Sequence, residues 1–142
     1  MEFENTVTIR RARPAVWAYV AALENIPRWN YAIESTTQTS AGPVGVGTEF
    51  DQTRTIPRRM TEHLTITEFE PEGLLAMEGD FGPFHGVTRY ELTAVDADTT
   101  TLVNTWNLKP PKLLGLLGNA LGGNVQRAVG ENLRVLQGLL ES

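Results

Sequence analysis

The sequence predicts an α+β fold with a seven-stranded antiparallel sheet, two short helices after the first strand and one long C-terminal helix. Three observations support this prediction. Residues 2–10 alternate between apolar and polar side chains, which is the period of a half-buried strand. Further strand-like segments are separated by turns rich in Gly, Pro and Asp. From Leu113 onwards, apolar residues recur at nearly every fourth position, which predicts a helix that buries one face.

Two short helices are expected between the first strand and the second. Pro14 suits the first turn of a helix, because the N–H that proline lacks has no helical partner there. Val16 and Val20 follow one helical turn apart, so this helix packs one stripe on the core. The residue before Pro27 is disfavoured in helical conformation, and residues 28–30 then predict a second short turn of helix.

Six strands are expected to follow as an antiparallel meander, because a short turn joins each strand to the next. Gly and Pro mark most of these turns, and an Asp-Ala-Asp sequence marks the last one. The expected strands occupy residues 31–39, 47–55, 59–69, 74–81, 84–95 and 99–108.

The C-terminal helix is expected to pack its apolar stripe against the sheet. Within it, Gly122 and Gly123 precede Asn124, which is a good residue to begin a helix, so we expect a kink or break at this point. The stripe consists of Leu113, Leu117, Leu121, Val125, Val129, Leu133, Leu136 and Leu140.

Length and composition limit the classes of function. The 142 residues predict one domain, residues 1–142, with a sizeable core. With no Cys and only two His, we expect no metal site and no cofactor. A net charge of −5 disfavours nucleic acid as a partner. The longest apolar stretch, residues 113–121, is about half the ~20 residues of a membrane span, so we expect no stable membrane insertion and, without a secretion signal, a cytoplasmic protein.

Several local motifs, in this order and spacing, resemble the START-like or SRPBCC superfamily, which includes bacterial polyketide cyclase/dehydrase-like proteins. The resemblance covers the whole chain and implies the helix-grip fold, in which a curved sheet wraps around the C-terminal helix with an apolar cavity between them. It carries over no catalytic residue, because members include lipid carriers, cyclases and hydroxylase subunits. The motifs are PAVW at 14–17, Trp29, GVGT at 45–48, EFEPEGLL at 68–75, YEL at 90–92, DTTT at 98–101 and the ending at 132–141.

Strand parity predicts which side chains line such a cavity, because alternate residues point to opposite faces of a sheet. Apolar walls with a few polar groups are typical of small-molecule pockets. Tyr90 and Trp106 are either ligand contacts or core residues with one satisfied polar atom. The residues expected to bind the ligand are Phe50, Gln52, Arg54, Leu64, Ile66, Met77, Phe81, Tyr90, Asn104, Trp106, Leu117, Leu121 and Val125.

Two further residues bear on mechanism. Arg54 lies near the strand end at Pro57, so it is either a rim residue paired with a surface carboxylate or an interior residue matched by Glu62 or by an anionic ligand. His85 is the candidate general base, because imidazole titrates near neutral pH, although no carboxylate at helical or strand spacing is positioned to orient it. The alternative for His85 is an exposed turn residue with no role in function.

The sequence leaves two main functions open. One is the binding of a small hydrophobic molecule, of aromatic, lipid or polyketide-like type, between the sheet and the C-terminal helix. The other is a polyketide cyclase/dehydratase-type enzyme that promotes aldol cyclisation or dehydration of such a molecule. An enzyme needs a titratable group within hydrogen-bond reach of its ligand, whereas a binding protein needs only the pocket. A third possibility, attachment to a membrane or protein, would require a large exposed apolar patch.

Overall fold

A computed structural model describes residues 1–111 and 118–142, with side chains in the second range described from residue 123 onwards. The helices are separated from most of the strands in the sequence. The short helices lie between the first and second strands, and the long helix follows the last strand. The elements are β1 (Glu2–Ile9), α1 (Arg13–Val20), the 3-10 turn η1 (Leu23–Asn25), α2 (Ile26–Trp29), β2 (Ile33–Gln38), β3 (Glu49–Arg54), β4 (Met60–Glu70), β5 (Leu74–Phe81), β6 (Phe84–Asp96), β7 (Thr99–Lys109) and α3 (Gly118–Glu141).

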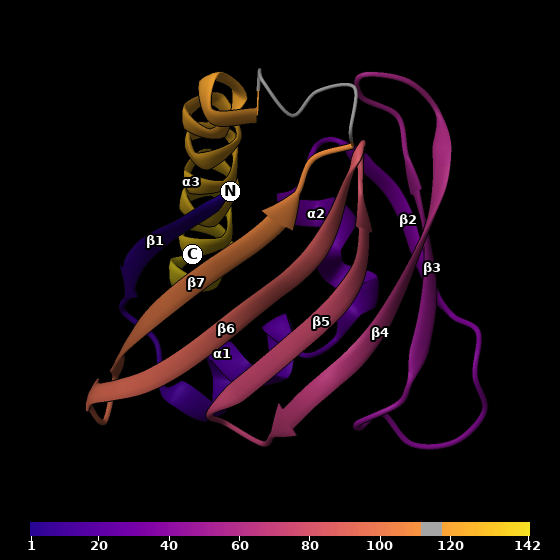
Figure 1. Ribbon diagram of the computed structural model, residues 1–142. Coiled ribbons are helices and arrows are strands. Elements are labelled where there is room, and N and C mark those ends of the chain that lie inside the picture. The colour runs from indigo at the N-terminus through magenta and orange to yellow at the C-terminus, as the bar shows by residue number, and fades with distance from the viewer. Residues whose placement is uncertain (112–117) are drawn as a thin grey trace.

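All seven strands form one antiparallel sheet in the order β1-β7-β6-β5-β4-β3-β2. From β2 to β7 each strand pairs with the next, which is the predicted meander, whereas β1 pairs with β7 at the far edge. Figure 1 shows the sheet curving around α3, with α1 and α2 on the same side. The predicted helix-grip fold is confirmed.

Gly79 of β5 lies opposite Gly86 of β6, and the backbone of a neighbouring strand approaches each of them closely. A Cβ atom on Gly79 would lie 2.1 Å from the carbonyl oxygen of His63, and one on Gly86 would lie 2.0 Å from that of Asn107. No residue with a side chain fits in either position without a shift of the backbone. These two glycines therefore allow the backbones of β4 and β5, and those of β6 and β7, to approach more closely than a side chain would permit.

The two short helices lie close to the predicted positions, with one correction. α1 places Pro14 in its first turn and buries Val16 and Val20, as predicted. The expectation that the residue before Pro27 leaves helical conformation is wrong, because Ile26 has φ −49° and ψ −44° and begins α2. Pro27 stands in the first turn, where the missing N–H needs no partner and the restraint on φ suits a helix.

The helix α3 is continuous from Gly118 to Glu141, so the predicted break at Gly122–Gly123 is wrong. Side-chain hydrogen bonds fasten the helix along β1: Gln126 Nε2 donates to the Glu4 carbonyl at 3.1 Å, and Gln137 Nε2 donates to the Thr8 carbonyl at 2.7 Å. These contacts and the burial of its apolar face offset the weak helix propensity of glycine, ~1 kcal/mol per residue. None of the helices in the described ranges has the length and hydropathy of a membrane span.

Candidate functional site

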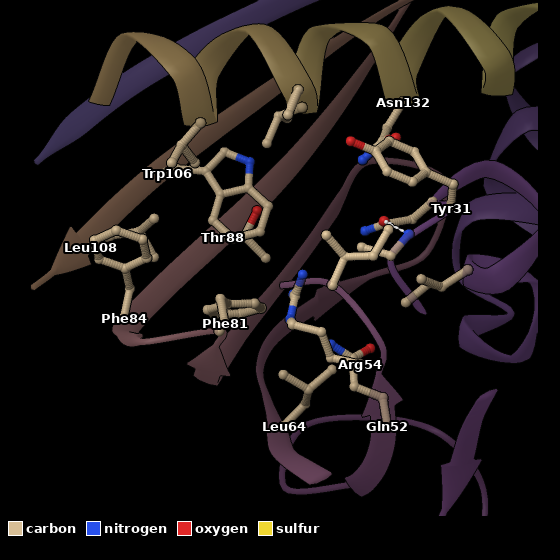
Figure 2. A pocket seen from close by; sticks show the side chains of 18 of the residues that line it. Tyr31, Gln52, Arg54, Leu64, Phe81, Phe84, Thr88, Trp106, Leu108 and Asn132 are labelled. Carbon is tan, nitrogen blue, oxygen red and sulfur yellow. Dashed lines mark hydrogen bonds between the residues drawn. The ribbon is translucent and has the colours of Figure 1, made fainter. Parts of the chain in front are cut away.

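A cavity of about 330 Å³ lies between the inner face of the sheet, α2 and α3 (Figure 2). Strands β3 to β7 supply the sheet wall, and α3 lies across from it. Most of the lining is aromatic or aliphatic, which suits an apolar ligand. The apolar residues of the sheet and α3 that line the cavity are Leu64, Met77, Phe81, Phe84, Trp106, Leu108, Val125, Ala128 and Val129.

The cavity opens at one end of the sheet. Tyr31 and Ile56 line it although 65% and 47% of their surfaces are exposed, and Pro57 and Pro83 line it beside them. These residues belong to the connections between α2 and β2, β3 and β4, and β5 and β6. The opening is therefore formed by three loops at the end where β3 and β5 finish.

Glu62 of β4 is fully buried and lies at the centre of a charged network beside the cavity. The register of β3 and β4 places Glu62 opposite Gln52, with Arg54 two residues further along on the same face. Arg54 Nε donates to Glu62 Oε2 at 2.6 Å, and Arg54 Nη2 donates to Oε1 at 3.3 Å. Two further donors, Gln52 Nε2 at 2.7 Å and the Gly82 backbone N–H, complete the set. Both carboxylate oxygens of Glu62 thus accept hydrogen bonds from within the protein.

A second network, without charge, supports the wall formed by β6 and β7. Asn104, which is fully buried, donates from Nδ2 to Thr88 Oγ1 at 2.9 Å and to the Arg89 carbonyl at 3.0 Å. Trp106 Nε1 donates to Asn104 Oδ1 at 2.5 Å, which fixes the indole ring. Phe81 packs edge-on against this ring, with centroids 4.8 Å apart. Asn104 thus orients the Trp106 side chain that faces the cavity.

Arg54, Asn132 and Tyr90 are polar residues of the cavity wall that retain hydrogen-bonding capacity. Arg54 Nη1 has no hydrogen-bond partner among the described residues, and neither does the side chain of Asn132, which is only 8% exposed and enters from α3. Burial raises the pKa of Tyr90 to about 12, with a smaller opposing effect of its hydrogen bond to Thr88. The Tyr90 hydroxyl therefore stays protonated at neutral pH.

Most of the predicted ligand-binding residues line the cavity, but several do not. Phe50, Ile66 and Asn104 are buried in the core but do not line the cavity, because strand parity gives the face of the sheet and not the position along the strand. Leu117 and the side chain of Leu121 lie outside the described residues. The predicted residues that do line the cavity are Gln52, Arg54, Leu64, Met77, Phe81, Tyr90, Trp106 and Val125.

The two alternatives for Arg54 are resolved by its burial and its partner. Its side chain is 15% exposed and is bound to the interior carboxylate of Glu62, so it is not a rim residue paired with a surface carboxylate. Figure 2 shows Arg54 and Gln52 on the same part of the wall, with Phe81 beside Arg54.

His85 does not line the cavity, so the structure gives it no position from which to act as a general base there. Its side chain is 57% exposed, and it alternates with Phe84 and Gly86, which face inwards. His85 Nδ1 lies 3.0 Å from Asp80 Oδ1, and Nε2 lies 3.4 Å from Glu78 Oε1. Hydrogen bonds to these two carboxylates raise the pKa of His85. The candidate base is therefore a surface residue on the outer face of the sheet.

Sequence reasoning missed Asn132, although a signal was present. Asn132 lies seven residues after Val125 and three after Val129, so it shares their face of α3. A polar residue on an apolar helix face marks a candidate contact. The loop residues at the opening, including Tyr31 and Ile56, carry no periodicity and could not be found this way. Among the described residues, no group of three or more His, Cys, Asp or Glu is placed to hold a metal ion.

Comparison with solved structures supports the fold. A START superfamily protein from Mycobacterium smegmatis has a TM-score of 0.81 and 14% identity, covering 99% of this chain and 97% of that one. The Zhui aromatase/cyclase from Streptomyces sp. R1128 has a TM-score of 0.79 and 17% identity, covering 99% and 93%. A protein from Thermus thermophilus has a TM-score of 0.75 and 18% identity, covering 96% and 94%. At these identities, the likeness establishes the fold alone.

Comparison with protein families places the sequence more directly. No curated protein matches it. Residues 1–141 match the family described as polyketide cyclase / dehydrase and lipid transport. The match covers nearly the whole chain and agrees with the seven-stranded sheet that curves around α3. The chain therefore belongs to the polyketide cyclase/dehydrase and lipid transport family, and it has the START-like, hydrophobic ligand-binding fold of that family.

Proposed function

We propose that this protein binds one small hydrophobic molecule, of aromatic, lipid or polyketide-like type, in the cavity between the sheet and α3. The cavity itself is the observation that carries the proposal. Its volume of about 330 Å³ is within the usual range of small-molecule sites, ~300 to 1,000 Å³. Its walls are largely apolar, and its loop-lined opening gives a ligand a route to them.

Cyclase or dehydratase chemistry is a second candidate, favoured by the polar groups on the wall and by the likeness to an aromatase/cyclase. Such chemistry needs a proton acceptor near the ligand. Among the described lining residues, the titratable side chains are Tyr31, Arg54 and Tyr90. With a pKa raised to about 12, Tyr90 is suited to donate a hydrogen bond and not to take up a proton at neutral pH. Binding without catalysis is therefore the better-supported function.

Binding can be measured with N-phenyl-1-naphthylamine, a neutral apolar dye that fluoresces strongly when it leaves water. We expect saturable binding with one site per chain. The Ala128→Phe variant places a larger side chain in the cavity from α3 and should weaken dye binding about tenfold or more. Mass spectrometry of an organic extract of the purified protein would identify what it carries from the cell.

Val135→Phe provides the matched control, because Val135 lies on the same helix but is 49% exposed and does not line the cavity. This variant should bind the dye with an affinity within about twofold of the wild type. Equal loss of binding in both variants, or no saturable binding by the wild type, would contradict the proposed function. Cooperative thermal unfolding of both variants would show that each is folded.

A further inference from the structure

The most unusual feature of the cavity wall is an arginine whose charge is already neutralised by the protein. Arg54 binds Glu62 through two nitrogens, and Glu62 is fully buried, so the two charges form a compact pair beside the ligand space. The remaining donors to Glu62, from Gln52 and Gly82, are uncharged. No other described residue that lines the cavity has a charged side chain. The described wall as a whole therefore carries no net charge.

This arrangement disfavours an anionic ligand. A carboxylate that bound Arg54 would either displace Glu62, leaving a buried carboxylate without its partner, or share the guanidinium with it at short range. Both outcomes are costly, because an unpaired charge in a poorly hydrated site is strongly destabilised. The pairing thus removes the attraction for anions that a free arginine would give.

A neutral ligand that carries oxygen atoms can bind beside the Arg54–Glu62 pair without this electrostatic cost. Arg54 Nη1 has no partner among the described residues, and the Tyr90 hydroxyl remains protonated. Asn132, more than nine-tenths buried, presents an amide from α3 without a hydrogen-bond partner in the described part of the chain. Figure 2 shows Asn132 and Arg54 entering from different walls. These atoms are accessible from the cavity, so the oxygen atoms of a neutral ligand can form hydrogen bonds with them.

We infer that the cavity selects neutral hydrophobic molecules that carry carbonyl, hydroxyl or ether oxygens, and that Glu62 enforces this selection against carboxylates and other anions. The inference rests on the proposed function and specifies the chemical class of the ligand. It also changes the role expected of Arg54, which acts as a hydrogen-bond donor within a neutral pair and not as an anion receptor.

A pair of matched dyes tests the inference. N-phenyl-1-naphthylamine and 1-anilinonaphthalene-8-sulfonate share the anilinonaphthalene framework and differ by one sulfonate, so the ratio of their dissociation constants reports the preference for charge. The wild type should bind the neutral dye about tenfold or more tightly than the anionic dye at neutral pH. Glu62→Gln leaves Arg54 without its counter-charge and should shift the ratio by about tenfold or more towards the anionic dye.

Two further variants keep the test decisive. Glu78→Gln removes an exposed carboxylate on the outer face and should leave the ratio within about twofold of the wild type. Should Glu62→Gln fail to fold, the double variant Arg54→Met/Glu62→Leu removes both charges and should retain the preference for the neutral dye.

The outcomes separate the two proposals. Absence of saturable binding of the neutral dye would overturn the proposed function and this inference with it. Binding of the neutral dye that Ala128→Phe abolishes, together with equal or tighter wild-type affinity for the anionic dye, would overturn the inference alone. An unchanged dye ratio in folded Glu62→Gln would also overturn it.

Discussion

Two arginine–carboxylate pairs, one with its arginine at the end of β3 and the other with its arginine in the loop between β3 and β4, have the same closest approach and different surroundings. Arg54 Nε lies 2.6 Å from Glu62 Oε2, and Arg59 Nη2 lies 2.6 Å from Glu34 Oε2. The side chains of the first pair are 15% and 1% exposed, whereas those of the second are 68% and 50% exposed. Burial, and not bond length, is what distinguishes them.

The difference determines what each pair does. Water competes for the exposed ions and salt screens them, so a surface pair contributes little to stability. A buried pair carries a large desolvation cost, and the loss of one partner leaves the other charge without compensation. Arg54–Glu62 can therefore affect both the stability and the specificity of the cavity wall, whereas Arg59–Glu34 is a solvated surface pair.

The largest effect is expected when the buried pair is broken. Arg54→Met keeps much of the apolar stem but leaves the buried Glu62 without its charged partner. We expect a loss of about 3–5 kcal/mol in the free energy of unfolding, measured by urea denaturation. Arg59→Met is the matched control and should leave the unfolding midpoint nearly unchanged. Equal destabilisation by both substitutions would show that burial does not distinguish the pairs.

A smaller effect is expected in the neutral network. Thr88→Val is nearly isosteric and removes the hydroxyl that accepts from Asn104 Nδ2 at 2.9 Å. One N–H of Asn104 Nδ2 still donates to the Arg89 carbonyl, but the other loses its acceptor in a buried site, so we expect a loss of about 2 kcal/mol in the same assay. A cost as large as that of Arg54→Met would mean that charge is not what makes the first network sensitive.

The smallest effect is expected on the outer face. Asp80 and Glu78 raise the pKa of His85 above its ordinary 6.5, so protonated His85 favours the folded state. This contribution is fully present below pH 6.5 and is lost as the pH rises through the higher pKa of the folded protein. His85→Gln should therefore lower the melting temperature slightly at about pH 5.5 and not at about pH 8.5.

The His85→Gln variant also tests whether this surface residue contributes to ligand binding in the cavity. Because His85 does not line the cavity, His85→Gln should bind N-phenyl-1-naphthylamine with an affinity within about twofold of the wild type. A tenfold loss of affinity in the folded variant would contradict the placement of the functional site on the inner face.

The sequence predicts the features of the fold that depend on neighbouring residues, but not those that depend on contacts between segments far apart in the chain. The strands follow from local turn residues and alternation, and parity correctly places Gln52 and Arg54 on the inner face. The need for glycine at positions 79 and 86 depends on backbone atoms of neighbouring strands, so no local pattern could predict it.

The same limit explains the errors at the candidate site. Local spacing offers His85 no orienting carboxylate, yet Asp80 lies opposite it across the β5–β6 pair. Phe50 and Ile66 have the predicted parity and are buried, but they do not line the cavity, because tertiary packing determines which part of the inner face the cavity occupies. Parity identifies a face, and only tertiary packing identifies a pocket.

The location of a bound neutral ligand tests the central claim most directly. A crystal structure of the complex with N-phenyl-1-naphthylamine should show the dye inside the cavity, with its rings near Phe81 and Ala128 and with Arg54 still bound to Glu62. Density for the dye only in the shallow depression beside Phe3 and Val87, with the cavity unoccupied by the dye, would contradict the assignment of the binding site.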